Sequence, residues 1–413
     1  MEKTFKILGL CLGGALVVSF LYSFNMESES HYGLASTEQE AFVIKEKVKH
    51  IDTPDPLKAI YMTQCVASRK DLRENIVKFI EDTEVNSIVI DIKDYTGTVA
   101  FDTGIREVDE IGGKGSGCRA PDMKGFVEYL HSKNIYVIGR VTVFQDPLYT
   151  KFKPEHAVKR KSDGGVWKDG KGLAFIDVGA RGAWDYPLSI AKASYDIGFD
   201  EINFDYIRFP SDGNMKDIDF THTGSSPAGE SKREMLRQFF EYLDKNLADT
   251  KMVTSADIFG MTTTNTDDLG IGQVLENALL YFDYVAPMVY PSHYPSKFNG
   301  WPDPNKVPYE IIKFSMDSAV VRAELLKREV VAKMYTTTAS STEKIKTATY
   351  NERIEKRLGK KQLRPWLQDF DYPVKYTPEM VRAQIQATYD TGLTSWMMWD
   401  PANTYTRSAY LEN

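Results

Sequence analysis

Cysteine and histidine are scarce in this chain of 413 residues. The three cysteines, Cys11, Cys65 and Cys118, exclude a framework of several disulfides and a cysteine-rich metal site. Cys65 and Cys118 leave room for one disulfide. The six histidines show no His-x-x-x-His or His-Glu-x-x-His spacing, which argues against a zinc hydrolase and a metal-dependent deacetylase. We therefore expect no metal site.

Positive charge is not in excess either, because the net charge is −7. A nucleic-acid partner requires a basic surface, so we expect none. What the chain does have is 42% hydrophobic and 12% aromatic residues, enough to build a large core. The aromatic residues suit a sugar-binding surface as well as an ordinary core.

One long apolar run lies near the N-terminus. Residues 7–24 carry no charge and follow Lys3 and Lys6, which predicts a single membrane-spanning helix with the rest of the chain outside the cytoplasm. Gly33-Leu34-Ala35 is a late and weak cleavage site, so an anchor is favoured over a cleaved signal. A buried core helix is the alternative.

A polar segment then separates this run from the remainder of the chain. Residues 25–56 are charged and contain Pro54 and Pro56, which is typical of a stalk. We therefore divide the chain into an anchor or signal over 1–24, a stalk or linker over 25–56 and a folded domain over 57–413.

Short apolar runs alternate with amphipathic stretches throughout the folded domain. The runs predict strands at 57–63, 87–93, 135–144, between Gly198 and Pro210, at 253–259, at 284–290, at 329–334 or 363–367, and at 395–399. The amphipathic stretches predict helices at 71–82, 123–133, 184–197, 231–247, 274–281, 309–328 and 378–391.

This alternation predicts an α/β fold of the (β/α)8 barrel type, also called a TIM barrel, preceded by the N-terminal transmembrane helix. The alternative is an open, doubly wound sheet. It is less favoured because no Gly-x-Gly-x-x-Gly follows the first strand. The glycine-rich residues 112–117 follow no strand directly and are interpreted as a loop tip.

Polar and aromatic residues recur where the predicted strands end. In a barrel these ends meet at one mouth, so residues far apart in the sequence become neighbours. Carboxylates with stacking aromatics are what a glycosidase cleft needs. The period of two along the fourth strand places Asn203 and Asp205 on one face, and Tyr206 and Arg208 on the other.

The candidate catalytic residues are Asp205 and Asp257. The candidate substrate-binding residues are Asp91, Lys93, Arg140, Asn203, Arg208, Tyr290, His293, Trp366, Asp369, Trp399 and Asp400. Each has a structural alternative. A single aspartate at a strand end is often a helix cap or an ion-pair partner. Arg140 can be a counter-ion for Asp91 or Asp205, and Trp366 and Trp399 can belong to the core.

Five segments carry a resemblance to a known family. They are 89–97, 139–147, 165–173, 198–213 and 364–370. In this order the chain resembles, over about residues 57–405, a bacterial barrel family known as putative glycoside hydrolases and first defined as a domain of unknown function. The resemblance implies the barrel fold, and a distant similarity to the α-amylase superclan.

In that superclan a nucleophilic carboxylate lies on the fourth strand, two residues after an arginine. Asp205 occupies the place of the nucleophile here, but Asn203 stands where the arginine would be. The acid on the fifth strand of the superclan is usually glutamate, whereas this chain offers Asp257.

The sequence thus predicts a membrane-anchored, extracytoplasmic hydrolase of glycosidic bonds in an extracellular or cell-envelope polysaccharide. Asp205 would be the nucleophile, ionised by Arg140 or Arg208, and Asp257 the general acid, its pKa raised by apolar neighbours. This chemistry requires no cofactor. The alternative is a non-catalytic carbohydrate-binding barrel at the cell surface.

Overall fold

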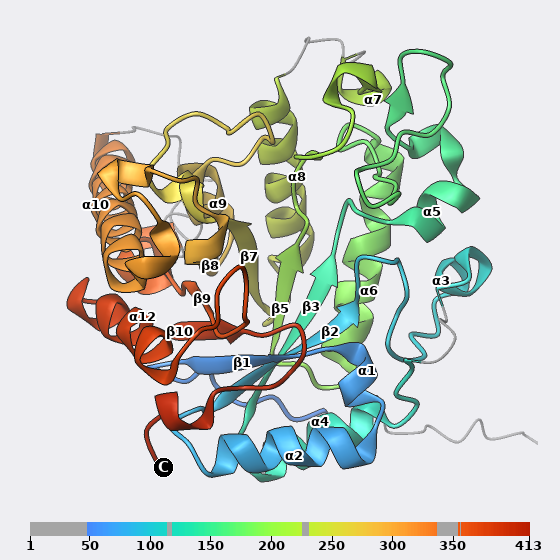
Figure 1. Ribbon diagram of the computed structural model, residues 1–413. Helices are drawn as coiled ribbons and strands as arrows, with labels where there is room; N and C mark the ends of the chain where they lie inside the picture. Colours follow the sequence, from blue (N-terminus) through green and yellow to red (C-terminus); the bar gives the residue numbers. More distant parts are fainter. Residues whose placement is uncertain (1–47, 114–117, 225–230, 337–353, 356) are drawn as a thin grey trace, which may run out of the picture. The chain divides into compact units, whose positions relative to one another are not determined.

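The computed structural model describes residues 48–113, 118–224, 231–336, 354–355 and 357–413, and its described strands include a closed parallel barrel (Figure 1). The barrel strands are β1 (Lys58–Met62), β2 (Ser87–Lys93), β3 (Tyr136–Thr142), β5 (Glu201–Asp205), β7 (Val253–Phe259), β8 (Tyr284–Met288), β9 (Trp366–Gln368) and β10 (Trp396–Trp399). Each pairs in parallel with its neighbours in this order, and β10 closes onto β1. The predicted (β/α)8 barrel is confirmed.

The described helices are α1 (Gln64–Ala67), α2 (Lys70–Glu81), α3 (Arg106–Ile111), α4 (Met123–Ser132), α5 (Pro147–Phe152), α6 (Asp185–Asp196), α7 (Thr221–Gly224), α8 (Lys232–Leu247), α9 (Leu275–Tyr281), α10 (Pro308–Thr336) and α12 (Pro378–Asp390). The seven predicted helices are present as α2, α4, α6, α8, α9, α10 and α12, and the short helices α1, α3, α5 and α7 are not predicted. α8 begins where the Ser231 hydroxyl accepts a hydrogen bond from the backbone N–H of Glu234. α12 begins where Thr377 caps the chain in the same way and Pro378 takes the first helical position.

One of the two ranges predicted for the seventh strand is wrong. Residues 329–334 lie inside α10, which continues to Thr336. No glycine or proline interrupts the chain between Pro308 and Thr336, so nothing in the sequence ends the helix earlier. The strand is β9, which overlaps the other predicted range, 363–367, and ends one residue after it.

The core has two parts, separated by the sheet. Residues from the outer face of the strands pack against the helices in one large cluster. A smaller cluster lies inside the barrel and includes the side chains of Tyr136, Ile138, Trp366 and Met397. Towards the carboxyl ends of the strands the interior becomes polar, and this change positions the site.

The segment between β3 and β5 is long and builds a layer beyond the strand ends. The arrowheads of β3 and β5 point towards the end of the barrel that carries α5 and α7 (Figure 1). In this layer the short strands β4 (Lys159–Arg160) and β6 (Ile218–Asp219) pair antiparallel. Elsewhere, Cys65 and Cys118 form the one disulfide for which the sequence left room.

The compact unit begins at Val48, within the predicted stalk. The backbone N–H of Ile51 donates to Asp200 Oδ1 at 2.8 Å, and Thr53 shares a 2.9 Å hydrogen bond with the Tyr136 hydroxyl. The predicted membrane segment, residues 7–24, lies outside the described residues and stays a prediction. Within the described part of the chain, no helix is both long and apolar enough to span a membrane.

Candidate active site

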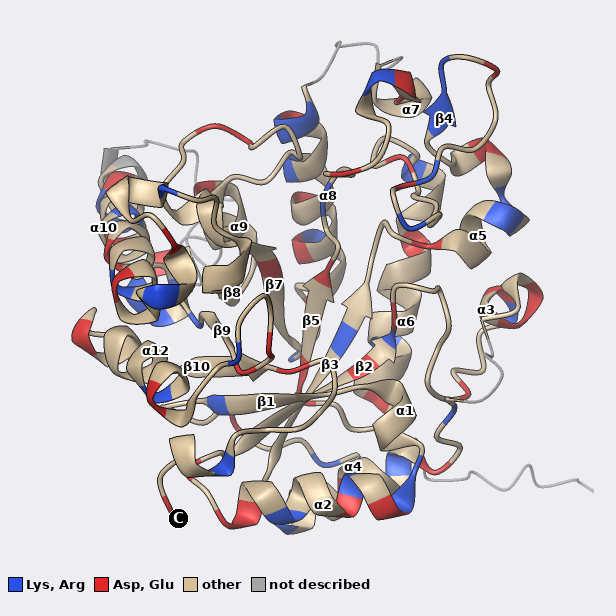
Figure 2. Cartoon of the chain, in the orientation of Figure 1, with Lys and Arg blue, Asp and Glu red and all other residues tan. Residues whose placement is uncertain are grey.

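Four polar side chains occupy one level of the barrel. Asp91 on β2 is paired in register with Arg140 on β3, Arg140 with Asn203 on β5, and Asn203 with Ser255 on β7. Residues at one level of a closed parallel barrel that point inward form a layer. Figure 2 shows a basic band on β3 and acidic bands on β2, β5 and β7. The acidic residues of β5 and β7 are Glu201, Asp205 and Asp257, which lie two residues from Asn203 or Ser255.

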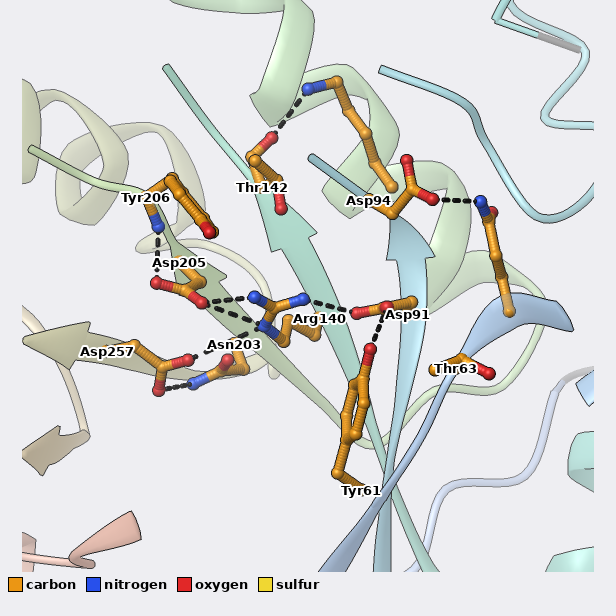
Figure 3. A network of polar contacts seen from close by, with 12 residues as sticks. Tyr61, Thr63, Asp91, Asp94, Arg140, Thr142, Asn203, Asp205, Tyr206 and Asp257 are labelled. Atoms are coloured by element: carbon orange, nitrogen blue, oxygen red, sulfur yellow. Dashed lines mark hydrogen bonds and ion pairs between the residues drawn. The ribbon is translucent and has the colours of Figure 1, made fainter. Parts of the chain in front are cut away.

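Arg140 is the centre of this layer (Figure 3). Its Nη1 donates to Asp91 Oδ1 at 2.6 Å, and its Nε and Nη2 both donate to Asp205 Oδ2, Nε at 3.0 Å. Nε also lies 3.8 Å from Asp257 Oδ2. Burial opposes the charge of Arg140, but Asp205 and Asp91 outweigh it and raise the Arg140 pKa well above its ordinary value. The permanently charged guanidinium of Arg140 therefore lies within 3.8 Å of three carboxyl groups, those of Asp91, Asp205 and Asp257.

Asp257 differs from Asp205 in its hydrogen bonds. Asn203 Nδ2 and Trp366 Nε1 both donate to the same oxygen, Asp257 Oδ1, at 2.9 and 2.8 Å. The carboxyl group is 1% exposed. Burial and the nearby charge of Asp205 raise the pKa of Asp257 well above its usual range, against the smaller effect of Arg140. Oδ2 is the oxygen left to carry the proton.

Asp91 lies on the other side of Arg140 and is held by an aromatic group. The Tyr61 hydroxyl donates to Asp91 Oδ2, and burial raises the pKa of Tyr61 well above its ordinary value, so the phenol keeps its proton. The Tyr61 ring stacks on Trp399 at 3.8 Å between centroids, and the Arg140 guanidinium lies 5.0 Å from the Trp399 ring. Burial also raises the pKa of Asp91.

The chain turns sharply immediately after Asp205. Tyr206 has φ +47°, a left-handed conformation that a residue with a side chain seldom adopts, and its N–H donates to Asp205 Oδ1 at 2.5 Å. The strand period therefore ends at Asp205. The expectation that Tyr206 and Arg208 face away from Asp205 is wrong, because both line the same cavity as Asp205.

That cavity has a volume of about 370 Å³. Its lining residues are Arg140, Lys171, Asp205, Tyr206, Arg208, Asp212, Asp257, Phe259, Gly260, Met261, Met288, Tyr290, His293, Tyr294 and Trp399. Both candidate catalytic carboxyl groups thus face one space, with aromatic walls from the ends of β5, β7, β8 and β10. Within the described residues, no cluster of three or more His, Cys, Asp or Glu side chains is arranged to hold a metal ion.

A family model described as "Putative glycosyl hydrolase domain" matches residues 59–332 and 327–405. The chain belongs to this family. The match spans the whole barrel, from β1 to the segment after β10. It makes the chain a glycosidase-like enzyme by family, and it agrees with the resemblance carried by the five sequence segments.

Solved structures are similar to this chain, and the two with TM-scores of 0.51 and 0.50 share its fold. A hypothetical protein from Ruminiclostridium thermocellum is 33% identical, with a TM-score of 0.43, over 51% of this chain and 98% of its own. The glycoside hydrolase domain of PgaB (BpsB) from Bordetella bronchiseptica is 11% identical, with a TM-score of 0.51, over 84% and 94%. The chitobiase FjGH20 from Flavobacterium johnsoniae is 9% identical, with a TM-score of 0.50, over 86% and 47%. No curated protein matches the sequence significantly.

The barrel of this family member brings most of the predicted site residues together. Asp205, Asp257, Arg140, Arg208, Tyr290, His293 and Trp399 line the cavity. Asp91, Asn203 and Trp366 lie one contact behind it, each hydrogen-bonded to Arg140 or Asp257. His293 packs edge-on against Tyr290 and Phe370, and burial lowers its pKa.

Three predicted residues have other contacts. Lys93 is fully buried, where its Nζ donates to the Thr142 carbonyl and pairs with Asp146 at 2.7 Å, after an irregularity in β2 between Asp91 and Lys93. Asp369 accepts hydrogen bonds from the N–H of Thr406 and from the Tyr410 hydroxyl.

Asp400 accepts from the N–H groups of Ala402 and Thr404 in the turn after β10. None of Lys93, Asp369 and Asp400 is among the residues that line the described cavity. Their predicted contacts with sugar stay predictions.

Sequence reasoning missed several residues of the site. Tyr61 does not line the cavity but donates to Asp91 behind it, and it lies inside an apolar strand, where it looks like a core residue. Phe259 and Met288 line the cavity and are the last residues of β7 and β8. Their positions at the carboxyl ends of β7 and β8 could have predicted Phe259 and Met288 as lining residues. Lys171 and Asp212 come from loops whose paths the sequence does not predict.

Proposed function

We propose that this chain hydrolyses glycosidic bonds, with Asp205 as the nucleophile and Asp257 as the general acid. The single observation that carries the proposal is the shared contact with Arg140, because Nε lies 3.0 Å from Asp205 Oδ2 and 3.8 Å from Asp257 Oδ2. Two carboxyl groups beside one cavity, held in different protonation states, are what this reaction needs.

The surroundings of the two groups support this division of roles. Asp205 accepts two charge-assisted hydrogen bonds from Arg140 and one hydrogen bond from the Tyr206 N–H. Asp257 receives its hydrogen bonds on Oδ1 only, and burial together with the charge of Asp205 raises its pKa. An ionised attacker thus lies next to a neutral proton donor.

The spacing favours retention of configuration at the anomeric carbon. Both Oδ2 atoms contact the same nitrogen, so their separation cannot exceed the sum of the 3.0 and 3.8 Å contacts. That limit reaches only the lower end of the roughly 6.5–9.5 Å typical of inverting enzymes, and it includes the roughly 5–5.5 Å of retaining ones. A covalent glycosyl-enzyme intermediate on Asp205 would follow.

The aromatic walls suit a polysaccharide. Trp399 on β10 and Tyr290 just after β8 line the cavity, where aromatic side chains can contact a sugar. The Cys65–Cys118 disulfide supports a location outside the cytoplasm, as does the predicted anchor over residues 7–24. We therefore include an extracellular or cell-envelope polysaccharide and a membrane-anchored position in the proposal.

The test is hydrolysis of a polysaccharide panel by the full chain, measured as new reducing ends. Wild type should cleave at least one polymer, and Asp205→Asn should lower kcat by at least about 10³-fold, because an amide cannot attack the anomeric carbon. Asp249→Asn, at an exposed aspartate at the end of α8, is the matched control. Cleavage that survives Asp205→Asn would contradict the assignment. Tight binding without cleavage by wild type would favour the carbohydrate-binding barrel.

A further inference from the structure

Two cations line the cavity without an acidic partner. Nη1 of Arg208 donates to the Phe209 carbonyl at 3.0 Å, but no carboxylate of the described residues forms an ion pair with its guanidinium. Lys171 lines the same cavity and also has no ion pair within the described part of the chain. Arg140 differs from both, because Asp91 and Asp205 already compensate its charge.

The surroundings of Arg208 are unfavourable for an uncompensated charge. Its guanidinium lies 4.8 Å from the Phe259 ring, 5.1 Å from that of Tyr206 and 5.9 Å from that of Phe175. Ring faces attract a cation, but they replace water only in part. Burial accordingly lowers the pKa of Arg208. A cation placed this way is stabilised when an anion enters the cavity.

Lys171 is brought to the cavity by a turn whose shape is fixed. The Asp169 carboxylate accepts hydrogen bonds from the N–H groups of Lys171 and Leu173, at 2.9 and 2.8 Å. The neighbouring Trp167 is 1% exposed, and its Nε1 donates to the Asn214 carbonyl at 3.1 Å, which joins this hairpin to the loop after β5. This turn belongs to segment 165–173, one of the segments that carried the family resemblance.

The acidic groups near Arg208 offset its charge only in part, because burial lowers its pKa more than Asp205, Asp212 and Asp169 raise it. Asp205 is engaged by Arg140, and Asp257 carries a proton in the proposed mechanism. Asp212 remains, an exposed side chain at the cavity wall that forms no described ion pair with Arg208. Arg208 and Lys171 thus bring two positive charges to the cavity wall, against the one negative charge of Asp212, in a chain whose net charge is −7.

We propose that this cavity accepts a sugar unit that carries a carboxylate, bound by Arg208 and, at longer range, by Lys171. A guanidinium matches a carboxylate with two parallel hydrogen bonds, which a neutral hydroxymethyl group cannot accept in the same way. The substrate class would then be an acidic polysaccharide. This inference rests on the proposed function, since it concerns the same site.

The test is the binding of single sugars to the full wild-type chain, followed by the fluorescence of tryptophan and by calorimetry. The probes are three pairs of an acidic and a neutral sugar. In glucuronate and glucose, and in galacturonate and galactose, a carboxylate replaces a hydroxymethyl group. In N-acetylmuramate and N-acetylglucosamine, the acidic sugar carries an added lactyl ether with a carboxylate. At least one acidic sugar should bind about tenfold more tightly than its neutral partner, the size expected for one charge-assisted contact. Added salt should reduce the difference.

Variants locate the effect. Arg208→Gln should abolish the preference for the acidic sugar, and Arg208→Lys should retain part of it, because the charge remains and the paired geometry is lost. Lys171→Gln should reduce the preference less. Lys168→Gln is the matched control, because Lys168 is an exposed lysine of the same hairpin that does not line the cavity.

Equal binding of acidic and neutral sugars by wild type overturns the inference, as does the absence of carboxylate-dependent binding up to the solubility limit of the probes. A preference that persists in Arg208→Gln also overturns it. Single sugars contain no bond between sugar units, so these results do not depend on hydrolysis. The inference can therefore fail while Asp205 remains the nucleophile, and the reverse also holds.

Discussion

Arg140 on β3 lies directly opposite Asn203 on β5, and its guanidinium contacts Asp205, two residues further along β5. The resemblance to the α-amylase superclan leads one to expect an arginine at position 203 itself. The neighbouring strand supplies that cation instead, because side chains in register on adjacent strands point into the same layer of the barrel. The asparagine is then available to donate to Asp257.

Arg140→Lys should lower kcat by about 10²-fold, with a smaller change in KM. An ammonium group can contact one carboxylate, but it cannot donate to Asp91 and Asp205 in the geometry of the guanidinium fork. Steady-state kinetics on the cleaved polysaccharide measures the effect. Arg364→Lys is the buried control, since Arg364 pairs with Glu201 among residues that do not line the cavity. An unchanged kcat in Arg140→Lys would show that the cation is structural only.

The pH profile of wild type should have an alkaline limb set by Asp257. As the general acid, Asp257 is active only when protonated. Burial and the charge of Asp205 raise its pKa, so the protonated form persists above the usual range of an aspartate. Activity is then lost as pH rises through the raised pKa of Asp257. We expect kcat/KM to stay high past about pH 4, the ordinary value for an aspartate, before it declines. A decline that begins near pH 4 would rule out Asp257 as the acid.

Trp366→Phe should move that alkaline limb to higher pH. The indole N–H donates to Asp257 Oδ1 and favours the charged carboxylate, so its removal raises the pKa of Asp257 further, while the phenyl ring keeps most of the packing. Trp396→Phe removes a comparable buried indole that donates to the Tyr389 hydroxyl, and it should leave the limb in place. Equal profiles for the two variants would refute the role given to Trp366.

Asp369 should make the folded state less stable as pH rises. Burial raises its pKa to about 6 from an ordinary value of 3.8, so the folded state holds its proton more tightly than the unfolded state. Between these two values the free energy of unfolding of wild type should fall by up to about 3 kcal/mol relative to Asp369→Asn, which has no such proton. Urea unfolding of both proteins from pH 3 to pH 8 measures the difference. A difference that is constant across this range would contradict the prediction.

The sequence predicts the barrel because each strand is buried on both faces and appears as an apolar run. β2 coincides with the predicted range 87–93, and β7 with 253–259. The barrel strand with two predicted ranges is also the shortest of the barrel, since β9 has three residues and competes with an apolar stretch that continues α10. A run of that length carries too little pattern to decide between strand and helix.

For the candidate site, the alternation of residues along a strand predicts the position of a side chain on the strand, but not the position of one in the loop that follows. Arg140, Asp205 and Asp257 are found because strand ends converge. Arg208 is assigned to the opposite face because the left-handed turn at Tyr206 cannot be predicted from alternation. Lys171 is not predicted because a long-range contact, such as the hydrogen bond from Trp167 to the Asn214 carbonyl, positions the hairpin that carries it. Such contacts between loops cannot be inferred from the local sequence.

The contact between Asp200 and Ile51 has a mechanical consequence. Asp200 immediately precedes β5, and its carboxylate also accepts hydrogen bonds from the N–H of Val137 and from His131. Tension on the polypeptide that leads into Val48 would therefore be borne by the stacking of His50 on Tyr195 of α6 and by the residue that precedes β5. Asp205 lies at the other end of that strand, five residues along. A pull on the chain would load the same strand that holds the proposed nucleophile.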